Sequence, residues 1–288
     1  MLKIIPLLLA ALGVVSAAAY AAPELTVTNF GQSIESENVS GTNDIDDLWL
    51  WNTVGLKYDD WSFGLTAGKQ WAVDFDDHTG YEKGVKSDDS RIQFDVAKPV
   101  TENLKLTGRY RGQKTYDRFQ VGYSYVNGMF LSSGDFFYDS KNGDARDAFH
   151  AEWHPIGVKL GAVQVKYYFE YVKNMGDVRV GENEETFEHQ IRLYAPLYTG
   201  ERLSLSTEGR FTIMQDKEFN GKKEGGYNVY DDFGRTRLYL KANYAMTENL
   251  DVFGTFGYEM REYKGKDGAN NSNDEYWSNV VIGYNYKF

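Results

Sequence analysis

Apolar and polar residues alternate along almost the whole chain, in segments of about ten residues. The final segment shows the pattern most clearly, because every second residue is apolar or aromatic: Val280, Ile282, Tyr284, Tyr286 and Phe288. In an extended strand, successive side chains point to opposite faces, so a period of two predicts a β-strand with one apolar and one polar face. A chain made of such segments is expected to form an all-β fold.

The alternation predicts fourteen strands, at residues 24–35, 48–58, 61–71, 88–98, 104–113, 118–126, 129–138, 146–154, 160–173, 185–195, 202–214, 232–243, 250–262 and 275–288. The facing of the segment at 129–138 is ambiguous, because Phe136 and Phe137 are adjacent apolar residues. No linker or low-complexity stretch separates the segments, so residues 22–288 are expected to form one domain.

The predicted connections alternate between short and long. The short set comprises 59–60, 101–103, 127–128, 155–157, 196–201 and 246–249. Asn127-Gly128 is typical of a two-residue hairpin loop. The other set is mostly longer, polar and acidic: 36–47, 72–87, 114–117, 139–145, 174–184, 215–231 and 263–274. Short turns at one end and long loops at the other are typical of transmembrane β-barrels, and an even strand count puts both termini at the short-turn end.

Residues 1–21 have the pattern of a secretory signal peptide. Lys3 supplies the positive charge, 4–15 form an apolar core, and Ala19-Tyr20-Ala21 matches the cleavage pattern. The alternative is a short N-terminal membrane anchor, but the apolar core is short for a span. We expect an exported protein.

The composition excludes several other classes of protein. Apolar stretches of about 20 residues, which helical membrane proteins need, do not occur beyond the first twenty or so residues. The 22 Tyr and 17 Phe argue against disorder, and the absence of Cys excludes disulfide scaffolds and thiolate metal sites. A net charge of −11 without any basic block argues against a nucleic-acid partner.

Three features favour a membrane barrel over an exported soluble β-sandwich. The polar face is rich in charge, as expected of the lining of an aqueous channel. Aromatic residues gather near strand ends on the apolar face, where membrane interfaces lie: Tyr58, Trp61, Tyr276, Tyr284, Tyr286 and Phe288. The chain also ends with Phe288 on an alternating strand, a pattern that resembles the sorting signal of outer-membrane proteins. Because backbone groups in lipid must all be paired, the sheet must close.

Charged residues on the polar face are the candidate pore-lining residues: Arg91, Arg109, Arg111, Lys166, Glu170, Glu188, Arg192, Glu208, Arg210, Arg235, Arg237, Lys241, Glu259 and Arg261. They could form a charged constriction that orients polar solutes. The alternative is cross-strand pairing that stabilises the wall, and the two roles are compatible. Aromatic residues on the same face could stack on sugars or fill space: Trp49, Trp51, Tyr168, Tyr194 and Tyr239.

An enzymatic reading is weak. No Gly-x-Ser-x-Gly elbow is present. His150, Glu152 and His154 share one face of a predicted strand and could mimic a metal or acid–base cluster, but no nucleophile, base and orienting group can be assembled around them. The acidic loops lack the twelve-residue calcium-loop spacing. We therefore expect no catalytic activity, no cofactor and no metal.

Several stretches of the sequence resemble those of the outer membrane protein G family, which are monomeric fourteen-stranded porins of enteric bacteria. They are 190–197, 165–171 with Asn174-Met175, 232–235 and the closing 283–288. The resemblance implies a monomeric, relatively nonspecific channel for small sugars and oligosaccharides. It also implies a pH gate, in which a long loop (here about 215–231) folds in under control of two facing histidines. The matching positions hold Asp231 and Tyr263, and neither is a histidine. Because an Asp carboxylate titrates at about pH 4, well below the range of a histidine, the pH switch is expected to be missing or changed.

The sequence thus predicts a porin of the Gram-negative outer membrane. Its expected partners are small polar solutes, including sugars, and the surrounding outer-membrane lipid and lipopolysaccharide. The mechanism is passive diffusion through a wet, charged lumen. The alternative from another class is a surface structural or adhesion barrel with a blocked lumen, and a barrel hydrolase is a more distant one.

Overall fold

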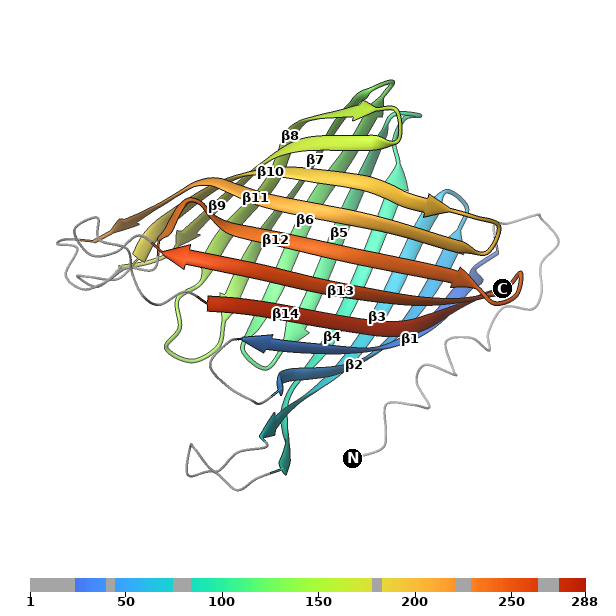
Figure 1. Cartoon of the computed structure of the whole chain (residues 1–288). Helices are drawn as coiled ribbons and strands as arrows, with labels where there is room; N and C mark the ends of the chain where they lie inside the picture. Colours follow the sequence, from blue (N-terminus) through green and yellow to red (C-terminus); the bar gives the residue numbers. More distant parts are fainter. Residues whose placement is uncertain (1–23, 40–44, 75–83, 178–182, 221–228, 264–274) are drawn as a thin grey trace.

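The computed structural model describes residues 24–39, 45–74, 84–177, 183–220, 229–263 and 275–288. The described residues form fourteen β-strands, which follow one another along the chain (Figure 1): β1 (Thr26–Val39), β2 (Ile45–Tyr58), β3 (Trp61–Asp74), β4 (Gly84–Pro99), β5 (Leu104–Gln113), β6 (Tyr116–Asn127), β7 (Phe130–Lys141), β8 (Ala148–Leu160), β9 (Val163–Asn174), β10 (Asn183–Thr199), β11 (Leu203–Phe219), β12 (Tyr230–Ala245), β13 (Leu250–Tyr263) and β14 (Glu275–Lys287). The predicted signal peptide, 1–21, lies outside the described residues.

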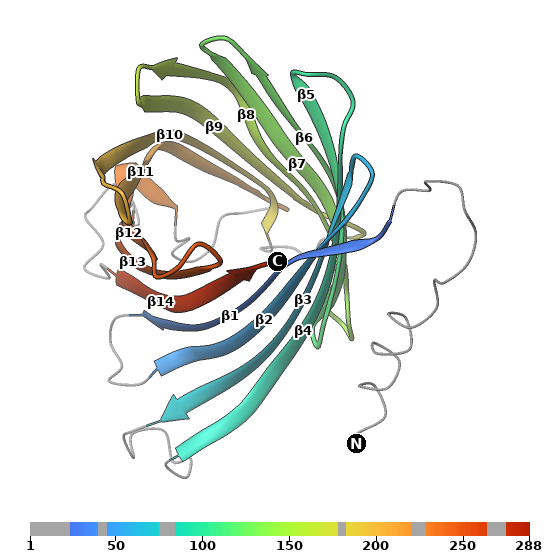
Figure 2. The ribbon, with the colours of Figure 1, turned by 90° about the vertical axis from the view of Figure 1, so that its right-hand side faces the viewer.

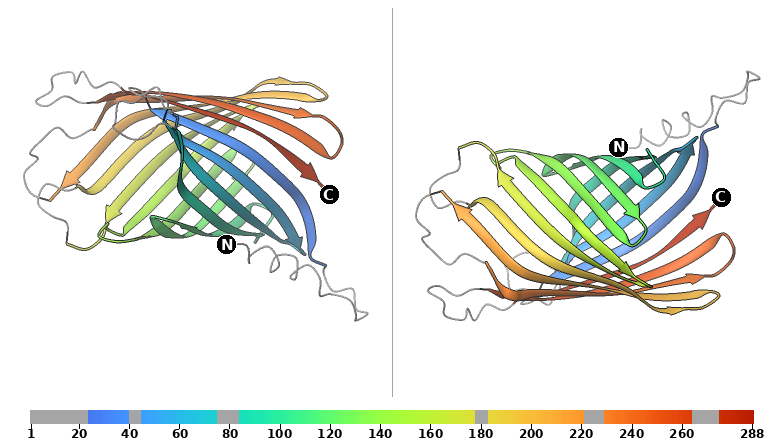
Figure 3. Two further views of the ribbon diagram at one scale, coloured as in Figure 1. Left: turned by 90° about the horizontal axis from the view of Figure 1, so that it is seen from below. Right: turned by 90° about the horizontal axis from the view of Figure 1, so that it is seen from above.

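The strands form one closed antiparallel barrel. Each strand pairs with its neighbours in sequence, and β1 pairs with β14 to complete the ring, with Ile34 opposite Ile282. The strands are steeply inclined in the views along and across the barrel (Figures 2 and 3). Closure gives the edge strands hydrogen-bonding partners, as an all-β protein in lipid requires. The prediction of a fourteen-stranded antiparallel barrel is confirmed.

The outer face of the barrel is apolar. Ile34 and Ile282 are 55% and 62% exposed. Comparable exposed side chains continue around the ring: Ile92, Phe94, Leu106, Phe119, Val121, Leu238, Leu240 and Phe256. Monomeric soluble proteins rarely expose a continuous apolar surface of this extent, whereas barrels in lipid carry an outward apolar band.

Aromatic side chains are exposed at both rims. Tyr58 and Trp61 flank the turn between β2 and β3, and Tyr286 and Phe288 end the chain at the same rim. Tyr276 is exposed at the opposite end of β14. The C-terminus lies beside the short β12–β13 connection (Figure 1). Amphipathic rings at these two levels suit the two interfaces of a bilayer.

Two predicted turns at prolines are wrong. Strand β8 continues through Pro155 to Leu160, and the turn lies at 161–162, where Gly161 has a φ of 62°. Strand β10 likewise continues through Pro196 to Thr199. The pairing shifts register between Trp153 and Ile156 and again between Pro196 and Tyr198. Proline has no N–H to give to the ladder, and a bulge accommodates it without ending the strand.

The short hairpins follow local turn chemistry. Asp59-Asp60 joins β2 to β3, as predicted, and Asp59 has a φ of 53°. Between β6 and β7 the two loop residues are Gly128 and Met129, one position beyond the predicted Asn127-Gly128, because Asn127 pairs with Phe130. Gly128 has a φ of 58°, which suits a Gly-first hairpin turn. Within the described ranges, no helix is long and apolar enough to cross a membrane.

Candidate functional site

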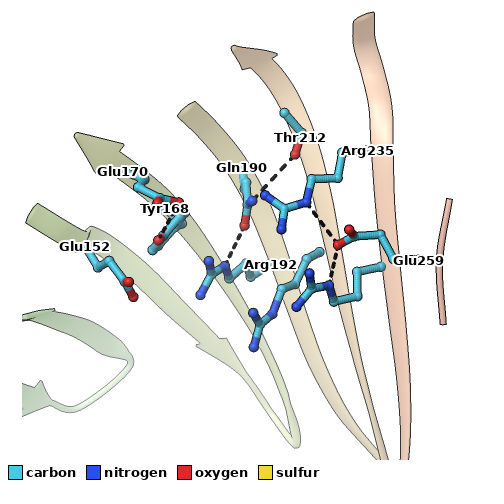
Figure 4. A pocket seen from close by; sticks show the side chains of 10 residues that line it. Glu152, Tyr168, Glu170, Gln190, Arg192, Thr212, Arg235 and Glu259 are labelled. Carbon is cyan, nitrogen blue, oxygen red and sulfur yellow. Dashed lines mark hydrogen bonds and ion pairs between the residues drawn. The ribbon is translucent and has the colours of Figure 1, made fainter. Parts of the chain in front are cut away.

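The inner face of the barrel carries the charged residues that alternate with the lipid-facing ones. On strands β8 to β13 they surround a cavity of about 230 Å³. Its lining is almost entirely polar (Figure 4): Glu152, Tyr168, Glu170, Gln190, Arg192, Arg210, Thr212, Arg235, Arg237 and Glu259. Of the fourteen predicted pore-lining residues, this cavity brings together six: Glu170, Arg192, Arg210, Arg235, Arg237 and Glu259.

Charges of one sign line up across neighbouring strands. Glu170 on β9 lies directly opposite Glu152 on β8 and Glu188 on β10. Four residues nearer the short-turn rim, a basic row crosses the wall, each member opposite the next: Lys166, Arg192, Arg210 and Arg237. Like charges placed directly opposite are destabilising. Some members of each row have partners at other levels of the wall, as Glu188 does in Arg235 and Arg210 does in Glu208.

Glu259 is the centre of a cluster of three ion pairs with arginines. Its carboxylate is bound by Arg235 Nε at 2.9 Å, by Arg261 Nε at 2.5 Å and by Arg237 Nε. The side chain is 0% exposed. Arg235 and Arg237 are on β12, while Glu259 and Arg261 are on β13, so the cluster ties two strands together.

Glu188 and Glu208 are neutralised in the same way. Arg235 Nη1 donates to both oxygens of Glu188, at 3.1 and 3.2 Å. The Thr212 hydroxyl and the Gln215 amide add hydrogen bonds to Glu188 at 2.7 and 3.1 Å. Glu208 binds Arg210 Nε and Lys241 Nζ, each at 2.6 Å. Lys166 and Arg192 have no carboxylate partner among the described residues, whereas five cations of this wall do have one: Arg210, Arg235, Arg237, Lys241 and Arg261.

The remaining predicted residues lie on the opposite wall. Arg109 Nε on β5 binds Asp95 at 2.5 Å, and Arg111 Nε donates to Gln93 at 3.0 Å. Arg91 Nε on β4 donates to Gln113 at 2.8 Å. These contacts join β4 to β5, which is the cross-strand role that the sequence left open beside pore lining.

The inner-face aromatic rings are covered by cations. Trp49 and Trp51 stack with centroids 4.4 Å apart, and the Arg91 guanidinium lies 4.8 and 5.1 Å from their rings. Arg192 lies 3.3 Å from the Tyr168 centroid. Lys166 lies over Tyr194, and Arg210 lies over Tyr239, each at 5.1 Å. A sugar could stack only on the part of a ring that these cations leave uncovered.

Neutral and acidic partners were missed from the sequence. Gln190 and Thr212 line the cavity, Gln215 binds Glu188, and Asp95 neutralises Arg109. Period-two positions on the same strands could have identified Gln190, Thr212 and Asp95, because each shares the face of a charged residue named from the sequence. Gln215 could not be found in this way, because a register shift in the β10–β11 pairing brings it to the inner face.

His150, Glu152 and His154 do lie on one strand, but they do not form a cluster. His150 stacks on Phe137 at 4.5 Å and lies 3.5 Å from Asp139. His154 Nδ1 is 3.4 Å from the Ser133 hydroxyl. Only Glu152 of the three lines the cavity. In the described part of the chain, no group of three or more His, Asp and Glu side chains could hold a metal ion.

The proposed gating positions are placed on adjacent strands. Tyr263 on β13 is directly opposite Tyr230 on β12, their rings are 5.1 Å apart, and the Tyr263 hydroxyl donates to Glu275 at 2.9 Å. The pair that faces across these strands is therefore Tyr230 and Tyr263; the side chain of Asp231 is outside the described residues. Strand β11 extends to Phe219 and β12 begins at Tyr230, so the predicted loop 215–231 is shorter than expected, and 221–228 lie outside the described residues.

A channel built on this pair is expected to gate only weakly between pH 5 and 7.5. Free tyrosine hydroxyls titrate at about pH 10, well above the range of a histidine switch. The open probability of single channels, recorded at both pH values in one bilayer, checks this. Sharp closure at the lower pH would contradict the prediction and point to another titrating group.

The closed ring, the apolar exterior and the charged interior define an outer-membrane β-barrel. No protein-family model matches this chain, and no curated protein matches it in sequence. Solved structures share the fold. A bacterial polysaccharide outer membrane secretin has a TM-score of 0.56 at 11% identity, covering 91% of this chain and 98% of that one.

Two monoaromatic hydrocarbon channels are similar at the same level. The TodX deltaS2S3 mutant has a TM-score of 0.54 at 7% identity, covering 93% of this chain and 91% of that one. CymD has a TM-score of 0.52 at 9% identity, with 93% and 89% covered. At these identities the likeness extends to the fold alone. The narrower resemblance to outer membrane protein G stays a prediction.

Proposed function

We propose that the protein is a porin that lets small hydrophilic solutes, including sugars and short oligosaccharides, diffuse passively across the outer membrane. The observation that carries this proposal is the polar cavity, lined by ten residues, inside a closed ring with an apolar exterior. A lining of charged groups keeps an interior wet, and wide barrels leave an aqueous channel.

The connections support an open interior. Among the described residues, those outside the strands are short rim segments, the longest being 142–147. In this part of the chain, no segment is available to fill the lumen. The fourteen candidate residues named from the sequence would then line the path, and their charges would orient dipolar solutes as they pass.

Single-channel recording in a planar bilayer tests the proposal. We expect discrete, mostly open conductance steps, and one-step events would support a monomer, whereas closure in threes would indicate a trimer. In parallel, liposomes that contain the protein should swell in sugars at rates that fall with sugar size. Folded barrel that gives neither current nor swelling would overturn the proposal in favour of a structural barrel with a blocked lumen.

A further inference from the structure

Two carboxylates and two cations of the cavity wall have no ion-pair partner in the described part of the chain. Glu259, Glu208 and Glu188 occupy the neighbouring cations, as described above. The unpaired acids are Glu152 and Glu170, and the unpaired bases are Lys166 and Arg192. Three of these four line the cavity: Glu152, Glu170 and Arg192.

Arg192 is the most informative of the three. It is 8% exposed, its Nε donates to Gln190 Oε1 at 2.8 Å, and its guanidinium lies over the Tyr168 ring. A buried charge is normally paired, because desolvation otherwise opposes it. A guanidinium is also suited to bidentate binding of a carboxylate. The cavity thus presents a cation that has no carboxylate partner among the residues that the structure describes.

Tyr168 holds this cation beside an acid. Arg192 is 3.3 Å from the ring centroid, and the hydroxyl of the same ring donates to Glu170 Oε2 at 3.1 Å. Glu152 is directly opposite Glu170 on the neighbouring strand. Figure 4 shows these side chains gathered on one side of the cavity. Tyr168 therefore contacts a cation through its ring and a carboxylate through its hydroxyl, and these two charged groups do not form an ion pair with each other.

We propose that Glu152, Glu170 and Arg192 form a binding subsite for zwitterionic solutes, namely amino acids and short peptides. The ammonium group binds between Glu152 and Glu170, and the carboxylate binds Arg192. This inference rests on the proposed function, since a solute must first enter the barrel. It adds a class of solute with two opposite charges a few ångströms apart. An extended two-residue peptide spans at most about 7 Å and carries one charge of each sign at its ends. A neutral sugar has no charge that could bind either the two glutamates or the arginine.

Glycylglycine and its blocked forms test the subsite on the unmodified protein. The readout is block of the single-channel current at pH 7 by four probes: glycylglycine, its N-acetyl form, its C-terminal amide and the doubly blocked form. We expect glycylglycine to bind most tightly, with each single block weakening binding at least about tenfold, because each removes one hydrogen-bonded charge pair. The doubly blocked form should not bind measurably.

Variants assign the two halves of the subsite. Arg192→Gln should weaken glycylglycine at least about tenfold while leaving the affinity for the carboxyl-blocked amide nearly unchanged. The double variant Glu152→Gln/Glu170→Gln should also weaken glycylglycine, while leaving the affinity for the N-acetyl form nearly unchanged. The control is Arg202→Gln, which removes an exposed guanidinium of the turn between β10 and β11 and lies outside the cavity. It should retain block by glycylglycine.

Two outcomes would overturn the proposal. If N-acetylated peptide blocks as well as glycylglycine, the site binds anions and not zwitterions. If all four probes fail to block an open channel, the subsite does not exist although the porin does. A protein that forms no channel would instead refute the proposed function, so the two failures are distinguishable.

Discussion

Glu259→Gln is expected to destabilise the barrel by about 3–5 kcal/mol, because it removes the shared partner of a buried charge cluster. Arg235, Arg237 and Arg261 would be left close together around a neutral amide. Repulsion among three guanidinium groups then adds to the loss of their hydrogen bonds. The free energy of unfolding, measured by urea titration of protein folded into lipid vesicles, checks this value.

Two further variants make the Glu259 result interpretable. Glu102→Gln changes an exposed residue of the turn between β4 and β5 and should alter stability by less than about 0.5 kcal/mol. The double variant Arg237→Gln/Glu259→Gln should cost less than the sum of its single changes, because these side chains share one interaction. A Glu259→Gln barrel as stable as the parent would show that the cluster does not hold β12 to β13.

Ile282→Arg is expected to cost about 2–4 kcal/mol in a bilayer, because it places a charge on the lipid face near the middle of a strand. Ile282 lies at the centre of β14 and is among the most exposed apolar residues of the barrel. The measurement is the same urea titration in vesicles. The expected loss comes from transferring the guanidinium into hydrocarbon, so it reports directly on what covers the outer face.

Val281→Arg is the matched control, since it places the same side chain one residue away on the opposite face. Val281 is directly opposite Glu35 on β1, so an arginine there gains an acidic neighbour. We expect it to cost less than about 1 kcal/mol, as lumen substitutions mainly tune selectivity. If Ile282→Arg were as mild as Val281→Arg, the exterior would face water, and the outer-membrane assignment would fail.

The inner wall shows why a charged face can be both structural and functional. Ion pairs join β10 to β12 through Glu188 and Arg235, and β12 to β13 through Glu259. Of these groups, Arg235 and Glu259 also line the cavity through which solutes are proposed to pass. A variant of such a group can therefore change both the stability of the barrel and the passage of solutes. Arg192 separates the two roles best, because it has no carboxylate partner in the described part of the chain.

The sequence by itself determined the strands and their faces. Period-two alternation is local, because each side chain's face depends only on its position in its own strand. That is why all fourteen strands could be predicted, together with charged residues such as Arg237 and Glu259 that share the inner face. Turn chemistry was less decisive: Pro155 and Pro196 indicated chain reversals, yet bulges absorb both prolines within continuous strands.

Only the tertiary structure decided which charges meet. Arg235 and Glu188 are 47 residues apart and two strands apart, and their contact depends on side-chain reach across the intervening strand β11, where Thr212 also donates to Glu188. Register fixes these meetings, and a shift of one residue in any pairing would exchange the lipid and lumen faces. Bulges and ring closure set that register over long sequence distances. For this reason the faces follow from the chain alone, whereas the cavity and its unpaired charges follow from the closed barrel.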